Sequence, residues 1–79
     1  MRLDKYLKVS RIIKRRTLAN EACDREKVTL NGRVAKAGAE VKEGDIIEIR
    51  FGEKVTKLRV CKVAEFMRKE ETADMYEIL

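Results

Sequence analysis

The sequence predicts an α+β fold in which two short helices are followed by a small antiparallel sheet. Apolar residues recur at helical spacing in the first third of the chain, and the spacing changes to that of strands at Val28. The 79 residues are 44% hydrophobic, which suits one modest core, and they include no proline and no Ser/Gly-rich linker. We therefore expect a single domain that spans residues 1–79.

Two helices are expected, over about residues 2–9 and about residues 17–25. Each has an apolar stripe at helical spacing and a polar face opposite it. The apolar stripes are Leu3, Tyr6 and Leu7 in the first helix, and Leu18, Ala19, Ala22 and Cys23 in the second. The opposite faces hold Asp4, Lys5 and Lys8, and then Asn20, Glu21 and Asp24. Thr17 is the predicted N-cap of the second helix, because its hydroxyl can accept a backbone N–H of the following turn.

A β-hairpin is expected where the strand pattern begins, at Val28. Residues 28–30 and 33–34 are two short β segments on either side of Asn31-Gly32. These two residues tolerate the positive φ that a tight hairpin turn requires. The stretch over residues 35–45, with its glycines, is expected to be a loop.

Two longer strands are expected over residues 46–51 and 56–63, joined by a turn at Gly52-Glu53. Their alternation is typical of a half-buried antiparallel sheet. The residues expected to face inward are Ile47, Ile49, Phe51, Leu58 and Val60. The last residues are predicted to form a short helix, with a strand over residues 76–78 as the alternative. The apolar stripe of that helix would be Ala73, Met75 and Tyr76.

The sequence argues against an enzyme and against a metal site. It has no histidine, which is the usual general base, and its two cysteines, Cys23 and Cys61, form no Cys-x-x-Cys motif. We predict no cofactor and no metal, and we expect both cysteines to be small buried residues. No apolar stretch approaches the roughly 20 residues that cross a bilayer, and the N-terminus has no signal-peptide segment. A cytoplasmic protein without a membrane partner is expected.

The positive charge of the chain is concentrated at its N-terminus. The net charge is +5, yet residues 1–16 hold seven Lys and Arg residues against Asp4 alone. The remaining residues hold 12 basic and 13 acidic side chains. This asymmetry points to an anionic partner that approaches from one side.

The basic run KVSRIIKRRT, residues 8–17, is expected to form the turn between the two helices. Ile12-Ile13 would anchor this turn in the core. Arg15 and Arg16 would precede the second helix, whose N-terminus has a partial positive charge and therefore gains nothing from them. A phosphate would gain from the arginines, the free N–H groups and the dipole together. A solvated surface, a membrane-surface helix and a targeting signal are the alternatives, and the clustering favours phosphate-rich nucleic acid.

RNA is favoured over DNA. No long exposed helix with base-reading side chains is predicted, and aromatic residues make up only 5% of the chain, too few for a platform that stacks single strands. Recognition of folded RNA by its shape and backbone remains.

The same residues resemble a known family. The matching residues are Arg2 to Leu7, Ser10-Arg11 and Arg15 to Ala19, then Val28, Leu30, Asn31-Gly32, Gly44-Asp45 and Ile47. As an ordered set, over at least residues 2–51, they resemble the S-four RNA-binding domain. The ending KEETADMYEIL resembles that of short, free-standing members of bacterial ribosome-associated quality control. Many S-four domains have a glycine just before the first strand, where this chain has Glu26-Lys27.

The resemblance implies two helices packed on a small, curved antiparallel sheet, with RNA held by the helical face. It implies a non-catalytic, ribosome-associated factor that binds obstructed large ribosomal subunits carrying peptidyl-tRNA. Such a factor contacts large-subunit rRNA and P-site tRNA, and works with RqcH during template-free alanine addition to the stalled chain. Nothing in the sequence suggests an obligate dimer, so a monomer is expected. The alternatives are a factor like heat-shock protein fifteen, a general structured-RNA binder, or a protein-interaction adaptor. The long basic extension of the heat-shock protein has no counterpart in this acidic tail.

The RNA-binding candidates are all in the first 16 residues. Arg2, Asp4 and Arg16 are the strongest, and Asp4 is expected either to orient an arginine, to accept a hydrogen bond from RNA, or simply to suit the dipole of its helix. The remaining candidates are Lys5, Lys8, Arg11, Lys14 and Arg15.

Overall fold

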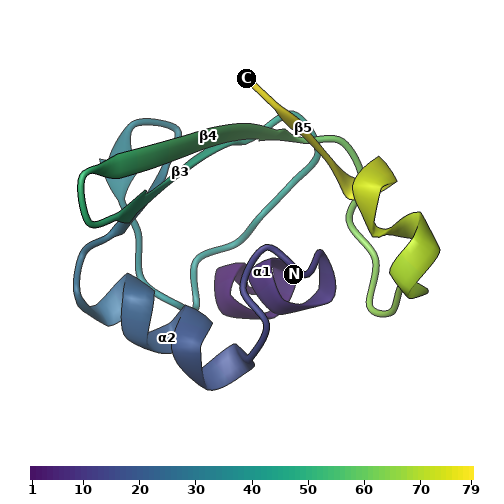
Figure 1. Ribbon diagram of the computed structural model, residues 1–79, viewed down its shortest axis with the longest axis horizontal. Coiled ribbons are helices and arrows are strands. Elements are labelled where there is room, and N and C mark those ends of the chain that lie inside the picture. The colour runs from purple at the N-terminus through teal and green to yellow at the C-terminus, as the bar shows by residue number, and fades with distance from the viewer.

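The computed structural model describes all 79 residues as two layers, with two helices on one side of a five-stranded antiparallel sheet (Figure 1). The helices are α1 (Leu3–Val9) and α2 (Arg16–Asp24), and a 3-10 helix, η1 (Lys69–Met75), precedes the last strand. The strands are β1 (Val28–Leu30), β2 (Arg33–Val34), β3 (Ile46–Phe51), β4 (Lys54–Val60) and β5 (Tyr76–Ile78). They are ordered β2-β1-β3-β4-β5. The predicted α+β class is confirmed.

The second helix starts one residue earlier than predicted. Arg15, with an extended backbone, is its N-cap, and Arg16 is its first helical residue. The prediction that Thr17 caps α2 is wrong: no side chain makes a cap hydrogen bond there, and the N–H of Ala19 is accepted by the carbonyl of Arg15, 3.0 Å away. The predicted apolar face is also wrong at Leu18, which is 50% exposed, because the core contacts this helix mainly through Ala19 and Cys23.

The hairpin signals of the sequence are confirmed. Asn31 and Gly32 have φ of 53° and 83°, as a two-residue turn of this kind requires, and β1 pairs with β2 across them. The Asn31 side chain also fixes the start of β3. Its Oδ1 accepts the Ile46 N–H at 2.9 Å and its Nδ2 donates to the Asp45 carboxylate at 3.1 Å.

The β3–β4 hairpin differs from the prediction at its ends. Strand β4 begins at Lys54 and ends at Val60, so residues 61–63 lie outside the sheet. Cys61 is therefore exposed, whereas Cys23 is buried, and the prediction of two buried cysteines holds only for Cys23. Phe51, predicted to face the core, is 49% exposed because it pairs with Lys54 at the turn, beyond the part of the sheet that the core covers.

The C-terminal segment contains both predicted alternatives in succession. The helix is η1, and the strand over residues 76–78 is β5, which pairs with β4. Met75 is completely buried, while Ala73, predicted on the same stripe, is exposed. The hydroxyl of Tyr6 donates to the Met75 carbonyl at 2.8 Å and so fastens this segment to α1. A 16-residue core lies between the helices and the sheet, and no helix of the chain has the length and apolarity to cross a membrane.

Glu26→Gly is expected to raise the free energy of unfolding by about 1 kcal/mol. Glu26 follows α2 with φ of 60°, and the N–H groups of Glu26 and Lys27 donate to the carbonyls of Cys23 and Ala22. This is the helix-ending arrangement that prefers glycine, and an L-residue with this backbone conformation costs about 1–2 kcal/mol of stability. Part of the gain from glycine is lost again, because glycine gives the unfolded chain more conformational entropy. Urea unfolding of both proteins measures the difference. A lower midpoint for Glu26→Gly would mean that the left-handed backbone of Glu26 is not strained.

Candidate RNA interface

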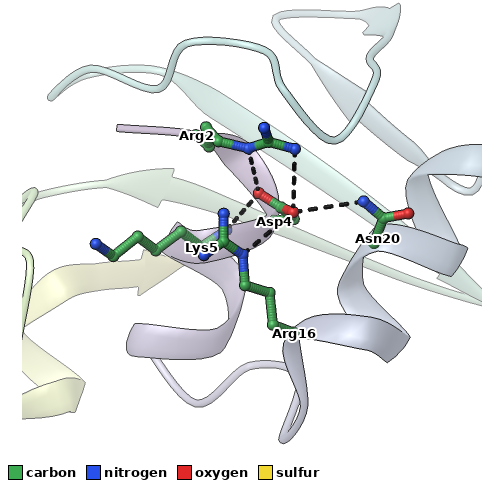
Figure 2. A network of polar contacts seen from close by, with 5 residues as sticks. All are labelled: Arg2, Asp4, Lys5, Arg16 and Asn20. Carbon is green, nitrogen blue, oxygen red and sulfur yellow. Dashed lines mark hydrogen bonds and ion pairs between the residues drawn. The ribbon is translucent and has the colours of Figure 1, made fainter.

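A buried carboxylate lies at the centre of the N-terminal basic residues (Figure 2). The Asp4 side chain is 3% exposed, and it accepts hydrogen bonds from the Nε of Arg2 at 3.1 Å and the Nε of Arg16 at 3.3 Å. Asn20 Nδ2 is 3.5 Å from it, and the backbone N–H of Lys5 donates at 2.8 Å. The prediction that Asp4 lies on the outer arc of the first helix is wrong, because these donors satisfy the carboxylate inside the fold.

Three segments bring these residues together. Arg2 is the N-cap of α1 and Arg16 is the first residue of α2, so both arginines extend from helix N-termini. The loop after β2 covers the start of α1: the N–H groups of Leu3 and Asp4 donate to the carbonyls of Ala39 and Ala37, at 2.8 and 3.1 Å. The side chains of Arg2 and Arg16 are 54% and 48% exposed, so each guanidinium contacts Asp4 with one edge and solvent with the other.

The ionised form of Asp4 is favoured by its partners. Burial by itself would raise the pKa of this carboxyl, but the hydrogen bonds from Arg2, Arg16 and Asn20, with the charge of Arg16, outweigh burial and hold the pKa below its ordinary value. A charged Asp4 therefore fixes the orientation of two arginines at neutral pH. Of the alternatives for Asp4, the geometry agrees with the one in which it orients Arg2 and an arginine of the basic turn.

The arginine pair leaves strong donors for a ligand. Arg16 uses only its Nε on Asp4, so its two terminal nitrogens have no acceptor within the chain. They border a polar hollow of about 400 Å³ whose other residues are Asp4, Thr17 and Asn20. Guanidinium nitrogens held in a fixed plane next to an uncapped helix N-terminus are suited to phosphate oxygens. No group of His, Cys, Asp and Glu side chains in the chain could hold a metal ion.

The other predicted residues surround this centre unevenly. The Nζ of Lys5 forms an ion pair with Glu65. Lys8 and Arg11 border a small hollow of about 80 Å³, and Arg11 has φ of 63° where the chain leaves α1 and turns toward α2. Arg15 and Lys14 are exposed, but Lys14 borders a different hollow, on the other flank of α2. The structure thus gathers Arg2, Asp4, Lys5 and Arg16, and it separates Lys14 from them.

Sequence reasoning missed Asn20 and Glu65. Asn20 was assigned to the solvent face of the second helix, yet it follows Arg16 by four residues and therefore shares its face, a signal that the helical spacing contained. Glu65 lies 60 residues from Lys5 in the sequence, and no local pattern predicts that pair. The predicted anchoring of the connecting turn is right, since Ile13 is 7% exposed and Ile12 is half-buried against the core.

Glu65→Gln is expected to raise the affinity for structured RNA about two- to fivefold, as is usual for one exposed charge. Glu65 forms an ion pair with Lys5, whose hydrogen bond and charge lower the pKa of the Glu65 carboxyl, so this carboxylate would compete with a phosphate for Lys5. Filter binding measures the change. Glu77→Gln is the control, because Glu77 pairs with Arg59 on the far strands. An equal gain for both variants would mean that only net charge matters.

Comparisons with known proteins identify the family of this chain. Residues 1–47 match the S4 domain family model. The RQC P-site tRNA stabilizing factor of Halalkalibacterium halodurans is 58% identical over 99% of this chain and 89% of its own length. The factor of the same name from Bacillus subtilis is 52% identical over 100% of this chain and 92% of its own length. Among solved structures, Vibrio cholerae Heat Shock Protein 15, described as trimeric, has a TM-score of 0.92 and 31% identity, over 100% of this chain and 81% of that one.

The family match includes both helices, the hairpin and the Asp4-centred arginine pair, and the identity to the two stabilizing factors extends over nearly the whole of each chain. The chain belongs to the S4 domain family and, within it, to the RQC P-site tRNA stabilizing factors.

Proposed function

We propose that this protein is a non-catalytic RNA-binding factor that stabilises P-site tRNA on obstructed large ribosomal subunits. The names and the high identity of its relatives support this function. The observation that supports it in the structure is the pair of arginines that one buried carboxylate holds at two helix N-termini. Such a pair presents fixed phosphate-binding groups, as an RNA binder requires.

The proposed contacts follow the geometry of the interface. Arg2 and Arg16 contact RNA phosphates, and Asp4 acts as a positioning residue between them. Lys5 joins them when a phosphate displaces Glu65. The other four candidates add positive charge that attracts RNA at longer range. They are Lys8, Arg11, Lys14 and Arg15, of which Arg11 and Lys14 lie apart from this centre.

On the ribosome, we propose that the factor contacts large-subunit rRNA and the P-site tRNA together. Holding the tRNA in this way would support RqcH-dependent alanine tailing of the stalled nascent chain. We propose that the factor acts as a cytoplasmic, ribosome-associated monomer.

The salt dependence of binding tests the RNA function. With a tRNA and an rRNA hairpin as ligands, log K is expected to fall linearly with log[salt], at a slope of about −0.7 to −0.9 per phosphate contacted. In sucrose gradients of lysate, the protein is expected to sediment with large subunits and to leave them at high salt. A flat salt response would argue against phosphate contacts. Recovery only at the top of the gradient would argue against the ribosomal role.

A factor like Heat Shock Protein 15 is the second candidate, and the likeness of the two folds favours it. The sequence identity to that protein is 31%, against 58% and 52% to the two stabilizing factors, so the tRNA-stabilizing function has the stronger support. Binding to large subunits in the presence and absence of P-site tRNA separates the two functions. Tighter binding with tRNA is expected for a tRNA-stabilizing factor.

A further inference from the structure

The other flank of α2 borders an apolar groove that lies apart from the Asp4-centred arginine pair. Residues 18, 22 and 25 recur at helical spacing on this flank, whereas Arg16 and Asn20 lie on the opposite one. A hollow of about 370 Å³ begins here, and the turn between β3 and β4 reaches the same end of the molecule (Figure 1). The hydrophobic residues that line it are Ile12, Ile13, Leu18, Ala22 and Phe51.

The groove continues past this hollow toward the edge of the sheet. A second hollow, of about 320 Å³, shares Ile12 and Phe51 with the first and extends along β4 to Tyr76 and Ile78 of β5. The two hollows therefore form one groove that is continuous through these shared residues. It ends at β5, the edge strand of the sheet.

Large apolar side chains remain half exposed along this groove. Leu18 is 50% exposed, Phe51 49% and Ile78 59%, although the core of the protein is complete without them. Single exposed apolar residues are common on protein surfaces, but several on one concave surface are typical of an interaction site. The groove is therefore shaped for a ligand with apolar side chains.

The rim of the groove is basic. Its cations are Arg11, Lys14, Arg25, Lys27 and Lys54, and its one acid is Glu21. Glu21 pairs with Arg25 at 2.9 Å, and the other four cations have no ion-pair partner. The occupant must then combine an apolar centre with negative charge at its sides.

We propose that this groove binds an acidic amphipathic segment of a partner protein, with aliphatic side chains in the two hollows and Asp or Glu side chains against the rim. RNA fits less well because six of the eight apolar residues that line the two hollows are aliphatic, and bases stack on aromatic rings. A second copy of the chain fits less well because each copy carries a net charge of +5. The size of each hollow, at the lower end of the roughly 300–1,000 Å³ of ligand pockets, suits a short segment.

Amide NMR of the labelled full chain, titrated with synthetic peptides of about 15 residues, tests this proposal. One peptide is an amphipathic helix of leucine and glutamate, the second has the same composition in scrambled order, and the third has lysine in place of glutamate. Saturable shifts at Leu18, Ala22 and Phe51 are expected for the first peptide alone, at micromolar concentrations.

Leu18→Ser and Phe51→Ser should each weaken this binding about tenfold, the effect expected for an apolar anchor. Val34→Ser should not, because Val34 is equally exposed but lies on β2, outside the groove. Affinity for RNA should be unchanged in all three variants, which separates this site from the proposed RNA interface. The proposal would be overturned if the scrambled or lysine peptide caused equal shifts, or if no peptide caused any shift. It would also be overturned if RNA caused shifts confined to the groove, or if the chain self-associated through the groove.

Discussion

Asp4→Asn is expected to weaken RNA binding about tenfold although it adds one to the net charge of +5. If charge alone decided the affinity, the variant would bind more tightly. The carboxylate, however, accepts hydrogen bonds from Arg2 and Arg16 on two different helices. An asparagine keeps one oxygen acceptor and loses the charge, so both guanidinium groups become free to rotate and must be ordered again when RNA binds.

The same substitution should lower the free energy of unfolding by about 2 kcal/mol, since it removes buried hydrogen bonds to charged groups. The pKa of Asp4 is lowered in the folded protein, so its contribution is complete above the ordinary value of 3.8 and is lost as the pH falls through the lower, folded-state pKa. The difference in unfolding free energy between the parent and Asp4→Asn should therefore shrink below about pH 4. Urea unfolding at pH 7, 4 and 3 measures it.

Asp24→Asn is the matched control for both effects. It makes the same change of charge at an exposed position at the end of α2, where Asp24 forms no ion pair. Its affinity for RNA should stay the same or rise slightly, and its stability should not fall, because an acid is unfavourable at a helix C-terminus. If Asp4→Asn strengthened RNA binding as much as Asp24→Asn, Asp4 would have no positioning role.

The elements of this fold could be predicted because local spacing determines them. The change from helical to alternating apolar residues at Val28 marked the boundary between the helices and the sheet, and Asn31-Gly32 marked the hairpin. Element ends were less predictable. Strand β4 stops at Val60, three residues before the predicted end. The next inward position is Lys62, and the backbone N–H groups of Cys61 and Lys62 both donate to the Met75 carbonyl instead of continuing the ladder.

Periodicity identifies a face but not what covers it, and the remaining errors follow from this. Leu18 and Phe51 are apolar at the expected spacing, yet no element covers them, and they line the groove instead. Asp4 had the opposite outcome. It lies on a charged arc of α1, but the loop at Ala37 and the side chain of Arg16 close over it. Such burial depends on contacts between residues far apart in the sequence, which no local pattern contains.

The sequence predicts one group of basic RNA-binding candidates, and the structure divides this group between two surfaces. Most of the candidates lie on or next to α1 and at the start of α2, but Arg11 and Lys14 border the apolar groove. The connecting turn separates them, because Arg11 adopts a left-handed backbone conformation and Ile13 enters the core between the two flanks. One continuous basic run in the sequence thus serves two surfaces of the molecule.

Arg16→Ala is expected to weaken RNA binding by about 1–3 kcal/mol, or about 5- to 150-fold. Arg16 combines two favourable features: its terminal nitrogens are free, and it begins a helix whose N-terminus attracts anions. The salt slope should also become shallower by about 0.7 to 0.9 for each phosphate that Arg16 no longer neutralises. Alanine is a good helix former and the Asp4 carboxylate keeps Arg2 and Asn20, so the folded structure should be retained. Filter binding over a salt series measures both quantities.

Two variants decide whether position or charge causes this weaker binding. Arg33→Ala removes one exposed charge from β2, where Arg33 has no contact with Asp4, and should weaken binding much less. Arg16→Lys keeps the charge, but one ammonium group cannot hold Asp4 with one edge and a phosphate with another, so it should recover only part of the affinity. Full recovery with lysine would mean that charge at this position is sufficient. Arg16 and Arg33 carry the same charge, and Arg16 differs in being held in a fixed orientation at the start of α2. Equal weakening by Arg16→Ala and Arg33→Ala would therefore mean that RNA responds to the total charge and contacts no particular arginine.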